Sequence, residues 1–259
     1  MTIRLILLLA ALSAGGYFPV LVVAEEGLVE PFYWRDLLTD DVEPAIASAR
    51  TNVGGRFEPA GWRVVGPQAF LRITLPRGLG AEGKLEVNVK GLDPGRLMAA
   101  IGRDKKVHFI NLFSNVTGDH HVEDGGGETD ALWTLRIGTD AAGASRYGQG
   151  FKLLWASRGA KRARGSDYAE TEVTLPAGSQ WDAAKTYTFA IHWSRSIRRL
   201  TVSLDQRIVA QVPWRDDEAP LRHAFLGGTP DFHALMGALF SDLRISSSPD
   251  TGMPPAVSE

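Results

Sequence analysis

The most informative stretch of the sequence is Thr186-Tyr187-Thr188-Phe189-Ala190-Ile191-His192-Trp193-Ser194. A large apolar or aromatic side chain occupies every second position of it. Successive side chains of a β-strand point to opposite faces, so this spacing predicts a strand with one buried face. A hairpin follows, with apolar residues alternating on both sides of a tight turn at Asp205-Gln206. The pattern therefore predicts at least three consecutive antiparallel strands.

The same period of two recurs through most of the chain, and Gly, Pro and Asp separate the short stretches that carry it. Helix is scarce, and it is expected at Tyr33–Leu38, in a turn at 182–185 and in a further turn before Gly237. The pattern predicts an all-β, two-sheet antiparallel β-sandwich. The expected strands are 61–65, 69–75, 83–89, 106–113, 132–137, 151–156, 169–175, 186–194, 199–204, 207–213 and 238–246.

The N-terminus has the pattern of a secretory signal. A short positive start precedes an apolar run that ends before Glu25-Glu26, with small residues at the positions that a signal peptidase reads. We expect cleavage after Ala24. The alternative is an uncleaved anchor, but Gly15-Gly16 and Pro19 interrupt the run, and spanning a bilayer takes roughly 20 apolar residues. The predicted organisation is a signal peptide at 1–24, an N-terminal extension at 25–53, the sandwich at 54–248 and a disordered tail at 249–259.

The composition further restricts the class of protein and the kinds of site that it can carry. Without its signal the chain keeps roughly 235 residues, a size that one large β-sandwich can have. The formal net charge is −2, which predicts no nucleic-acid binding. No cysteine is present, so thiolate metal sites and thiol catalysis are excluded. We expect a secreted or periplasmic protein with no membrane span after signal cleavage.

Three motifs together resemble the laminin G-like/concanavalin A-like lectin/glucanase superfamily. Their motifs are Tyr187-x-Phe189-x-Ile191-x-Trp193, the hairpin phrase from Val202 to Val209, and Phe240-Ser241-Asp242-Leu243-Arg244-Ile245-Ser246. Residues 55–62 and 83–91 are similar to its opening strands. The resemblance covers about residues 54–248, and it implies a concanavalin A-like jelly roll whose concave sheet holds an extended sugar chain. Because this fold hosts both binding modules and enzymes, it does not decide the function.

This sequence matches the catalytic motifs of that superfamily poorly. Its retaining glucanases use carboxylates in a Glu-x-Asp-x-(x)-Glu strand, since hydrolysis needs two carboxyl groups close together. The nearest match here is Glu170-Thr171-Glu172, which lacks the central Asp. Alginate-lyase relatives carry Gln-Ile-His, and this chain has Ala190-Ile191-His192 instead. The sequence therefore identifies no catalytic site.

Polar residues opposite the expected core predict one polar sheet face. Arginine binds carboxylates in a bidentate manner and histidine exchanges protons near neutral pH, so such a face would suit an acidic polysaccharide. A solvated sheet face explains the same alternation. The catalytic candidates are His108, His192 and Arg136, and Trp62, Trp181 and Trp214 are candidates for stacking on sugars. The ligand-binding candidates are Glu86, Asn88, Lys90, His108, Arg136, Lys152 and His192.

Metal binding has weak support in the sequence. Asp242 is a candidate ligand for a structural calcium, but calcium takes six or more oxygens and no others can be named. His120 and His121 lie beside carboxylates, yet two adjacent histidines cannot both face one ion from a strand. We expect no cofactor apart from that calcium.

Three functions remain open. The leading hypothesis is an exported carbohydrate-binding β-sandwich that engages a polysaccharide without catalysis. The first alternative is a polysaccharide lyase or glycoside hydrolase of the same fold. The second is a structural or adhesion module that binds an envelope protein, with residues 31–38 docking on that partner or packing on the sandwich itself.

Overall fold

The structure is a computed structural model that describes residues 31–93, 107–113, 132–138, 152–158, 168–173, 181–213, 222–230 and 233–248. The expected signal peptide at 1–24 and the tail at 249–259 lie outside these ranges.

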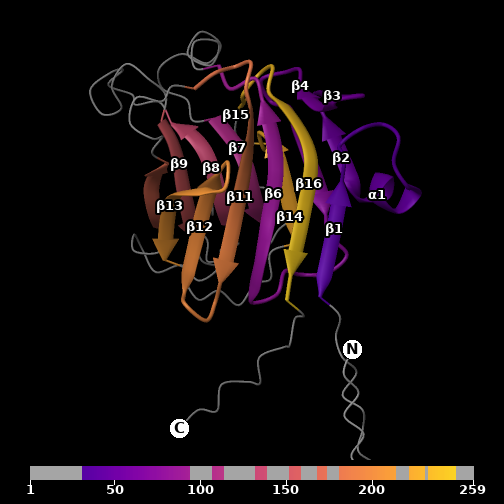
Figure 1. Ribbon diagram of the computed structural model, residues 1–259. Coiled ribbons are helices and arrows are strands. Elements are labelled where there is room, and N and C mark those ends of the chain that lie inside the picture. The colour runs from indigo at the N-terminus through magenta and orange to yellow at the C-terminus, as the bar shows by residue number, and fades with distance from the viewer. Residues whose placement is uncertain are drawn as a thin grey trace, which may run out of the picture.

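The described strands form two sheets that face each other as a sandwich (Figure 1). In sheet A the order is β13-β12-β11-β6-β16-β4-β3, with β1 also paired to β16; in sheet B it is β10-β9-β8-β7-β14-β5-β2, with β15 paired to β7. All pairings are antiparallel except that between β15 and β7. Sheet A contains β1 (Phe32–Asp36), β3 (Gly55–Glu58), β4 (Gly61–Val64), β6 (Glu82–Lys90), β11 (Thr186–Ser194), β12 (Arg199–Leu204), β13 (Arg207–Pro213) and β16 (Leu239–Ser247). Sheet B contains β2 (Arg50–Val53), β5 (Phe70–Thr74), β7 (Val107–Phe113), β8 (Leu132–Gly138), β9 (Lys152–Arg158), β10 (Tyr168–Val173), β14 (His223–Gly227) and β15 (His233–Ala234).

The core lies between the sheets and includes most of the described residues that the alternation assigns to it, although Ile208, also expected there, is 63% exposed beside an irregularity in the β12–β13 pairing. On β11 the side chains of Tyr187, Phe189, Ile191 and Trp193 are all buried. Phe189 of sheet A meets Phe109 of sheet B edge to face, with ring centroids 5.3 Å apart, a favourable aromatic geometry. The prediction of an all-β, two-sheet sandwich is confirmed.

The residues of the N-terminal extension take part in both sheets. Strand β1 pairs with β16, and β2 pairs with β5. The expected helix at Tyr33–Leu38 is wrong, because these residues alternate between buried and exposed positions along β1. The only helix in the described ranges is α1 (Pro44–Ala49), which has proline in its first turn.

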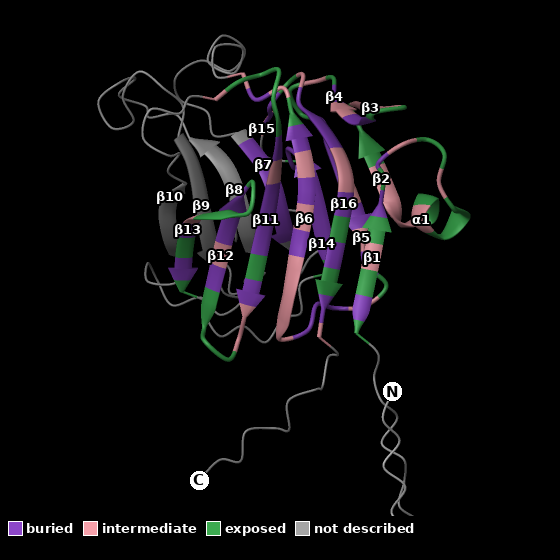
Figure 2. Ribbon diagram, viewed as in Figure 1, coloured by how far each residue is buried: buried purple, intermediate pink, exposed green. Residues whose placement is uncertain are grey.

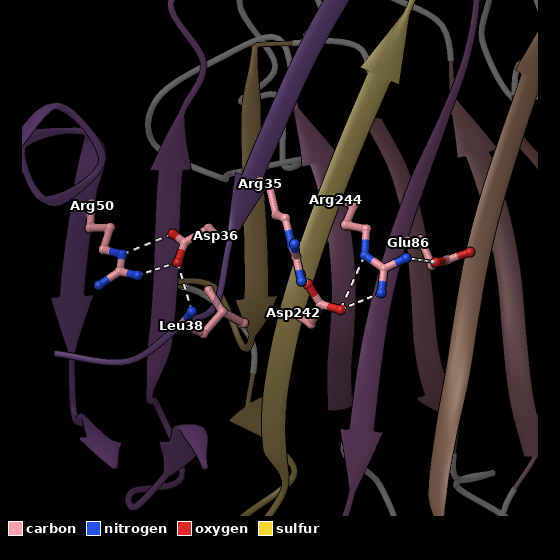
Figure 3. A network of polar contacts seen from close by, with 7 residues as sticks. All are labelled: Arg35, Asp36, Leu38, Arg50, Glu86, Asp242 and Arg244. Atoms are coloured by element: carbon pink, nitrogen blue, oxygen red, sulfur yellow. Dashed lines mark hydrogen bonds and ion pairs between the residues drawn. The ribbon is translucent and has the colours of Figure 1, made fainter. Parts of the chain in front are cut away.

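One buried ion pair connects β1 of sheet A to β2 of sheet B. Arg50 of β2 binds the Asp36 carboxylate at the end of β1, and the backbone N–H of Leu38 donates to Asp36 Oδ1 at 2.7 Å (Figure 3). Arg50 Nη1 also donates to the carbonyl of Thr39 at 2.7 Å. Burial without such partners would be costly for either charge, so these hydrogen bonds explain how the pair is accommodated.

Candidate functional site

The residues predicted to share one polar face are divided between the two sheets. Glu86, Asn88 and Lys90 lie on β6 and His192 lies on β11, all in sheet A. His108 lies on β7 in sheet B, and Arg136 and Lys152 lie on β8 and β9 of that sheet. The expectation of a single face is therefore wrong. Alternation fixes which side of a strand is buried, but it does not determine the sheet to which the strand belongs.

The outer face of sheet A is polar and open to solvent (Figure 2). Residues directly opposite each other on paired strands project from the same face. The pairing places one line of outward residues across six strands, here named the Tyr33 row. Its members, from β13 to β1, are Gln211, Thr201, His192, Lys84, Ser246 and Tyr33.

Tyr33 is the exposed aromatic residue of this row, with 64% of its surface accessible. Its neighbours Phe32 and Asp36 are buried on the opposite side of β1. Tyr33 was not among the predicted site residues, because a helix was expected at this position. The alternation of Phe32, Trp34 and Asp36 with Tyr33 and Arg35 was the signal that could have found it.

An ion-pair network lies next to the row on the same face (Figure 3). Arg244 on β16 binds both Asp242 and Glu86, with Nη1 3.1 Å from Glu86 Oε1. Arg35 of β1 donates from Nε to Asp242 Oδ1 at 2.9 Å, and Lys84 also pairs with Glu86. Each carboxylate of the network therefore has two cationic partners.

These contacts keep carboxylates ionised. The hydrogen bond from Arg244 lowers the pKa of Asp242, with a further contribution from Arg35. At the edge of the same sheet, hydrogen bonds from Arg63 and Arg56 lower the pKa of Glu58 to about 2. Such groups serve as fixed negative charges near neutral pH, whereas a general acid needs a pKa close to the working pH.

His192 is exposed in the middle of the row. Partial burial lowers the pKa of His192 below its ordinary value, Lys84 lowers it further, and Glu86 acts in the opposite direction. The imidazole is accordingly neutral at pH 7, where one ring nitrogen donates and the other accepts a hydrogen bond.

A cleft of about 470 Å³ opens at the far end of β6, here named the rim cleft. It lies between the turn after β6, the turn before β11 and the start of β16. Lys90, predicted from the sequence as a ligand-binding residue, is one of its lining residues, and the other lining residues were not predicted. The lining consists of Ala60, Arg63, Lys90, Gly91, Asp93, Ala183, Ala184, Gly237 and Leu239.

The outer side of sheet B is buried at the described positions of β7 and β14. His108 and Asn111 are 1% and 0% exposed. His108 Nδ1 donates to Asn111 Oδ1 across 2.9 Å. His108 is also the register partner of Arg136 on β8, so the structure brings two catalytic candidates to neighbouring positions. The side chains of Arg136 and Lys152 lie outside the described part.

The tryptophans proposed for sugar stacking have structural roles where they are described. Trp62 is fully buried and donates from Nε1 to Asn52 Oδ1 at 2.9 Å. Trp181 packs on the core and contacts Tyr187 at 5.1 Å between ring centroids. Trp214 lies outside the described residues.

No group of three or more potential ligand side chains gathers to hold a metal ion within the described ranges. The calcium candidate Asp242 is bound by two guanidinium groups. His120 and His121 fall outside these ranges. No helix among the described residues is long and apolar enough to cross a membrane.

No protein-family model matches the chain, and no curated protein sequence matches it. Among solved structures, the binding domain of botulinum neurotoxin serotype D aligns with a TM-score of 0.50 at 11% identity, over 77% of this chain and 43% of that one. Crh5 transglycosylase in complex with NAG aligns with a TM-score of 0.48 at 14% identity, over 86% and 87%.

Domain 4 of AbnA, a GH43 extracellular arabinanase from Geobacillus stearothermophilus in complex with arabinotriose, gives a TM-score of 0.43 at 10% identity, over 85% and 84%. The chain spans less than half the length of the neurotoxin chain that it matches. At these identities the likeness concerns the fold alone, a two-sheet β-sandwich.

Proposed function

We propose that this chain is an exported, non-catalytic carbohydrate-binding module of the laminin G-like/concanavalin A-like kind, which binds a polysaccharide along the outer face of sheet A. The observation that carries the proposal is the Tyr33 row. It combines an exposed aromatic ring with hydroxyl, amide, imidazole and ammonium groups in one line.

The dimensions of the row suit an extended polymer. Neighbouring strands lie 4.7–4.9 Å apart, so six strands span about 24 Å from Gln211 to Tyr33. Along this distance the polar side chains can hydrogen-bond sugar hydroxyls, while an exposed aromatic ring such as Tyr33 offers an apolar surface with a polar tip. This pairing of apolar body and polar groups is what a sugar ring requires.

The electrostatics of the face favour binding over hydrolysis. Glycoside hydrolysis needs one carboxyl group that stays protonated until it reacts. The carboxylates with a shifted pKa in the described part are Glu58, Glu82 and Asp242, and each is lowered. Glu58 and Asp242 bind arginines and Glu82 accepts hydrogen bonds from Ser194 and Ser196, so these carboxylates do not supply a proton near neutral pH.

The proposal is tested by isothermal titration of the full chain with a panel of neutral and acidic oligosaccharides. Changing Tyr33 to Ala is expected to weaken binding roughly three- to ten-fold, by loss of aromatic contact, whereas Tyr33→Phe retains most of it. The matched control is Ile208→Ala on β13, because Ile208 is 63% exposed and lies outside the row. Equal affinity of Tyr33→Ala and the unchanged chain would reject the row as the binding surface.

A second function, a polysaccharide lyase, is favoured by the placement of His108 and Arg136. Their register pairing on β7 and β8 puts a potential base next to a potential carboxylate-binding cation. The near-complete burial of His108 leaves no room for a polymer in this conformation. Release of unsaturated uronates, followed by ultraviolet absorbance and lost in His108→Ala, would establish this function; no release from acidic polymers would eliminate it.

A further inference from the structure

The rim cleft lies at a different place on sheet A from the Tyr33 row. Lys84 of the row and Lys90 of the cleft are six residues apart on β6, which corresponds to about 20 Å along the strand. The cleft volume of about 470 Å³ falls in the range of small-molecule sites. The two features can therefore be tested separately.

The floor of the cleft follows from strand register. Leu239 on β16 pairs with Lys90 on one side and with Arg63 on the other. Opposite residues project from the same face, so the two cations flank an apolar side chain that is 9% exposed. Ala183 and Ala184 add apolar surface to the wall.

Arg63 and Lys90 differ in whether their charged groups already have partners within the protein. Arg63 donates from Nε to both oxygens of Glu58 at 2.9 Å and from Nη1 to the carbonyl of Gly237 at 3.2 Å. This guanidinium is fixed and neutralised. Lys90 is exposed, and in the described part of the chain its ammonium has no ion pair or hydrogen bond. Of the two cations, Lys90 therefore carries the charge that is available to a ligand, and Asp93 is the acidic residue of the lining.

The walls are held by backbone contacts. The N–H of Gly91 donates to the carbonyl of Ala183 at 3.1 Å, and the N–H of Gly237 donates to the carbonyl of Val64 at 2.9 Å. Gly91 has φ of +86°, and a Cβ there would lie 2.6 Å from the carbonyl oxygen of Gly237. The turns that shape the cleft therefore approach each other as closely as glycine allows.

We propose that the rim cleft binds a carboxylate-bearing sugar unit, a uronate, with its carboxylate on Lys90 and its C–H face on Leu239. This inference rests on the proposed carbohydrate-binding function and names its substrate class. A charge-assisted contact is stronger than a neutral one, so the cleft selects acidic over neutral chains. Arg63 contributes a second, fixed donor group at the opposite wall.

The test compares a uronate oligosaccharide with its carboxyl-reduced, neutral counterpart, titrated into the full chain. The acidic form is expected to bind at least about ten-fold more tightly, and Lys90→Met to remove that preference, as loss of a hydrogen bond to a charged group predicts. Lys90→Arg should preserve most of the preference. Arg199→Ala, which removes an exposed cation from another part of sheet A, should leave it unchanged.

Two results would overturn the inference: equal affinity for the acidic and neutral forms, or an acidic preference that survives in Lys90→Met. If either result is obtained while binding still depends on Tyr33, the proposed function stands and only the proposal for the cleft is rejected. Conversely, if the acidic preference depends on Lys90 while Tyr33→Ala leaves the affinity unchanged, the cleft is supported and the row is rejected as the binding surface.

Discussion

The outer faces of the two sheets carry the same residue types in opposite environments. On sheet A, Tyr33 and His192 are exposed and Asn88 is half-buried; on sheet B, Phe225 and Asn111 are buried. Phe225 lies outside the main core and forms a small separate cluster with Phe70. The outward positions of the two sheets therefore differ: they form a solvated, largely polar face on sheet A, whereas on β7 and β14 of sheet B they are buried.

The largest expected effect separates the aromatic residues of the two faces. Changing Phe225 to Ala should lower the free energy of unfolding by about 3–5 kcal/mol, because it leaves a cavity in a packed site. Tyr33→Ala should change it by no more than about 0.5 kcal/mol, as exposed substitutions generally do. Urea denaturation measures both.

Phe225→Leu provides a control for the case in which Phe225→Ala does not fold. It conserves most of the volume and should cost less than about 1.5 kcal/mol. Similar losses for Phe225→Ala and Tyr33→Ala would show that the two faces do not differ in packing.

The next effect compares two asparagines. Asn111→Ala removes the acceptor of the buried His108 Nδ1–H and should cost about 1–3 kcal/mol, the penalty for an unsatisfied buried donor. Asn88 accepts from Thr188 Oγ1 at 2.8 Å on the half-exposed face of sheet A. Water can replace that bond, so Asn88→Ala should cost less than about 1 kcal/mol. Thermal or urea unfolding of both variants would contradict this ordering if Asn88→Ala were the more damaging change.

The smallest expected effect is the dependence of stability on pH. Burial lowers the pKa of His223 on sheet B, and Arg72 and Arg222 lower it further; the pKa of His192 is lowered by burial and Lys84, but Glu86 opposes the shift. The unfolded chain then takes up a proton before the folded chain does. Stability is therefore unaffected well above pH 6.5 and declines as the pH falls below that ordinary value.

Urea denaturation between pH 5 and pH 8 checks this prediction. His223→Gln should flatten the decline more than His192→Gln, because no acidic neighbour offsets the shift at His223. A steeper decline in His223→Gln would mean that the sign of the linkage is wrong.

Much of the fold was predictable because it depends on local alternation. Strands β6, β11, β12 and β13 follow the expected ranges within about a residue or two. Strand β14 was missed since all five of its residues are buried, which removes the period of two. Strand β1 was predicted as a helix because so short an aromatic stretch does not distinguish the strand period of two from the helical period of 3.6.

The candidate site was predictable only in part, because its assembly depends on long-range pairing. Glu86, Asn88, Lys90 and His192 were correctly placed on the side of their strands opposite the core aromatics. That His108 belongs to the other sheet, and that Tyr33 lines up with His192 through two intervening strands, follows from the order of strands. No local pattern encodes that order.

The Asp36–Arg50 ion pair has a consequence for self-association. Strand β1 pairs only with β16 and β2 only with β5 among the described strands, so each leaves one backbone edge without a strand partner. Edges of this kind are templates for pairing with another chain. The buried ion pair joins the end of β1 to the start of β2 (Figure 3), so it ties the two edge strands together and opposes the strand movement that would present either edge to another chain.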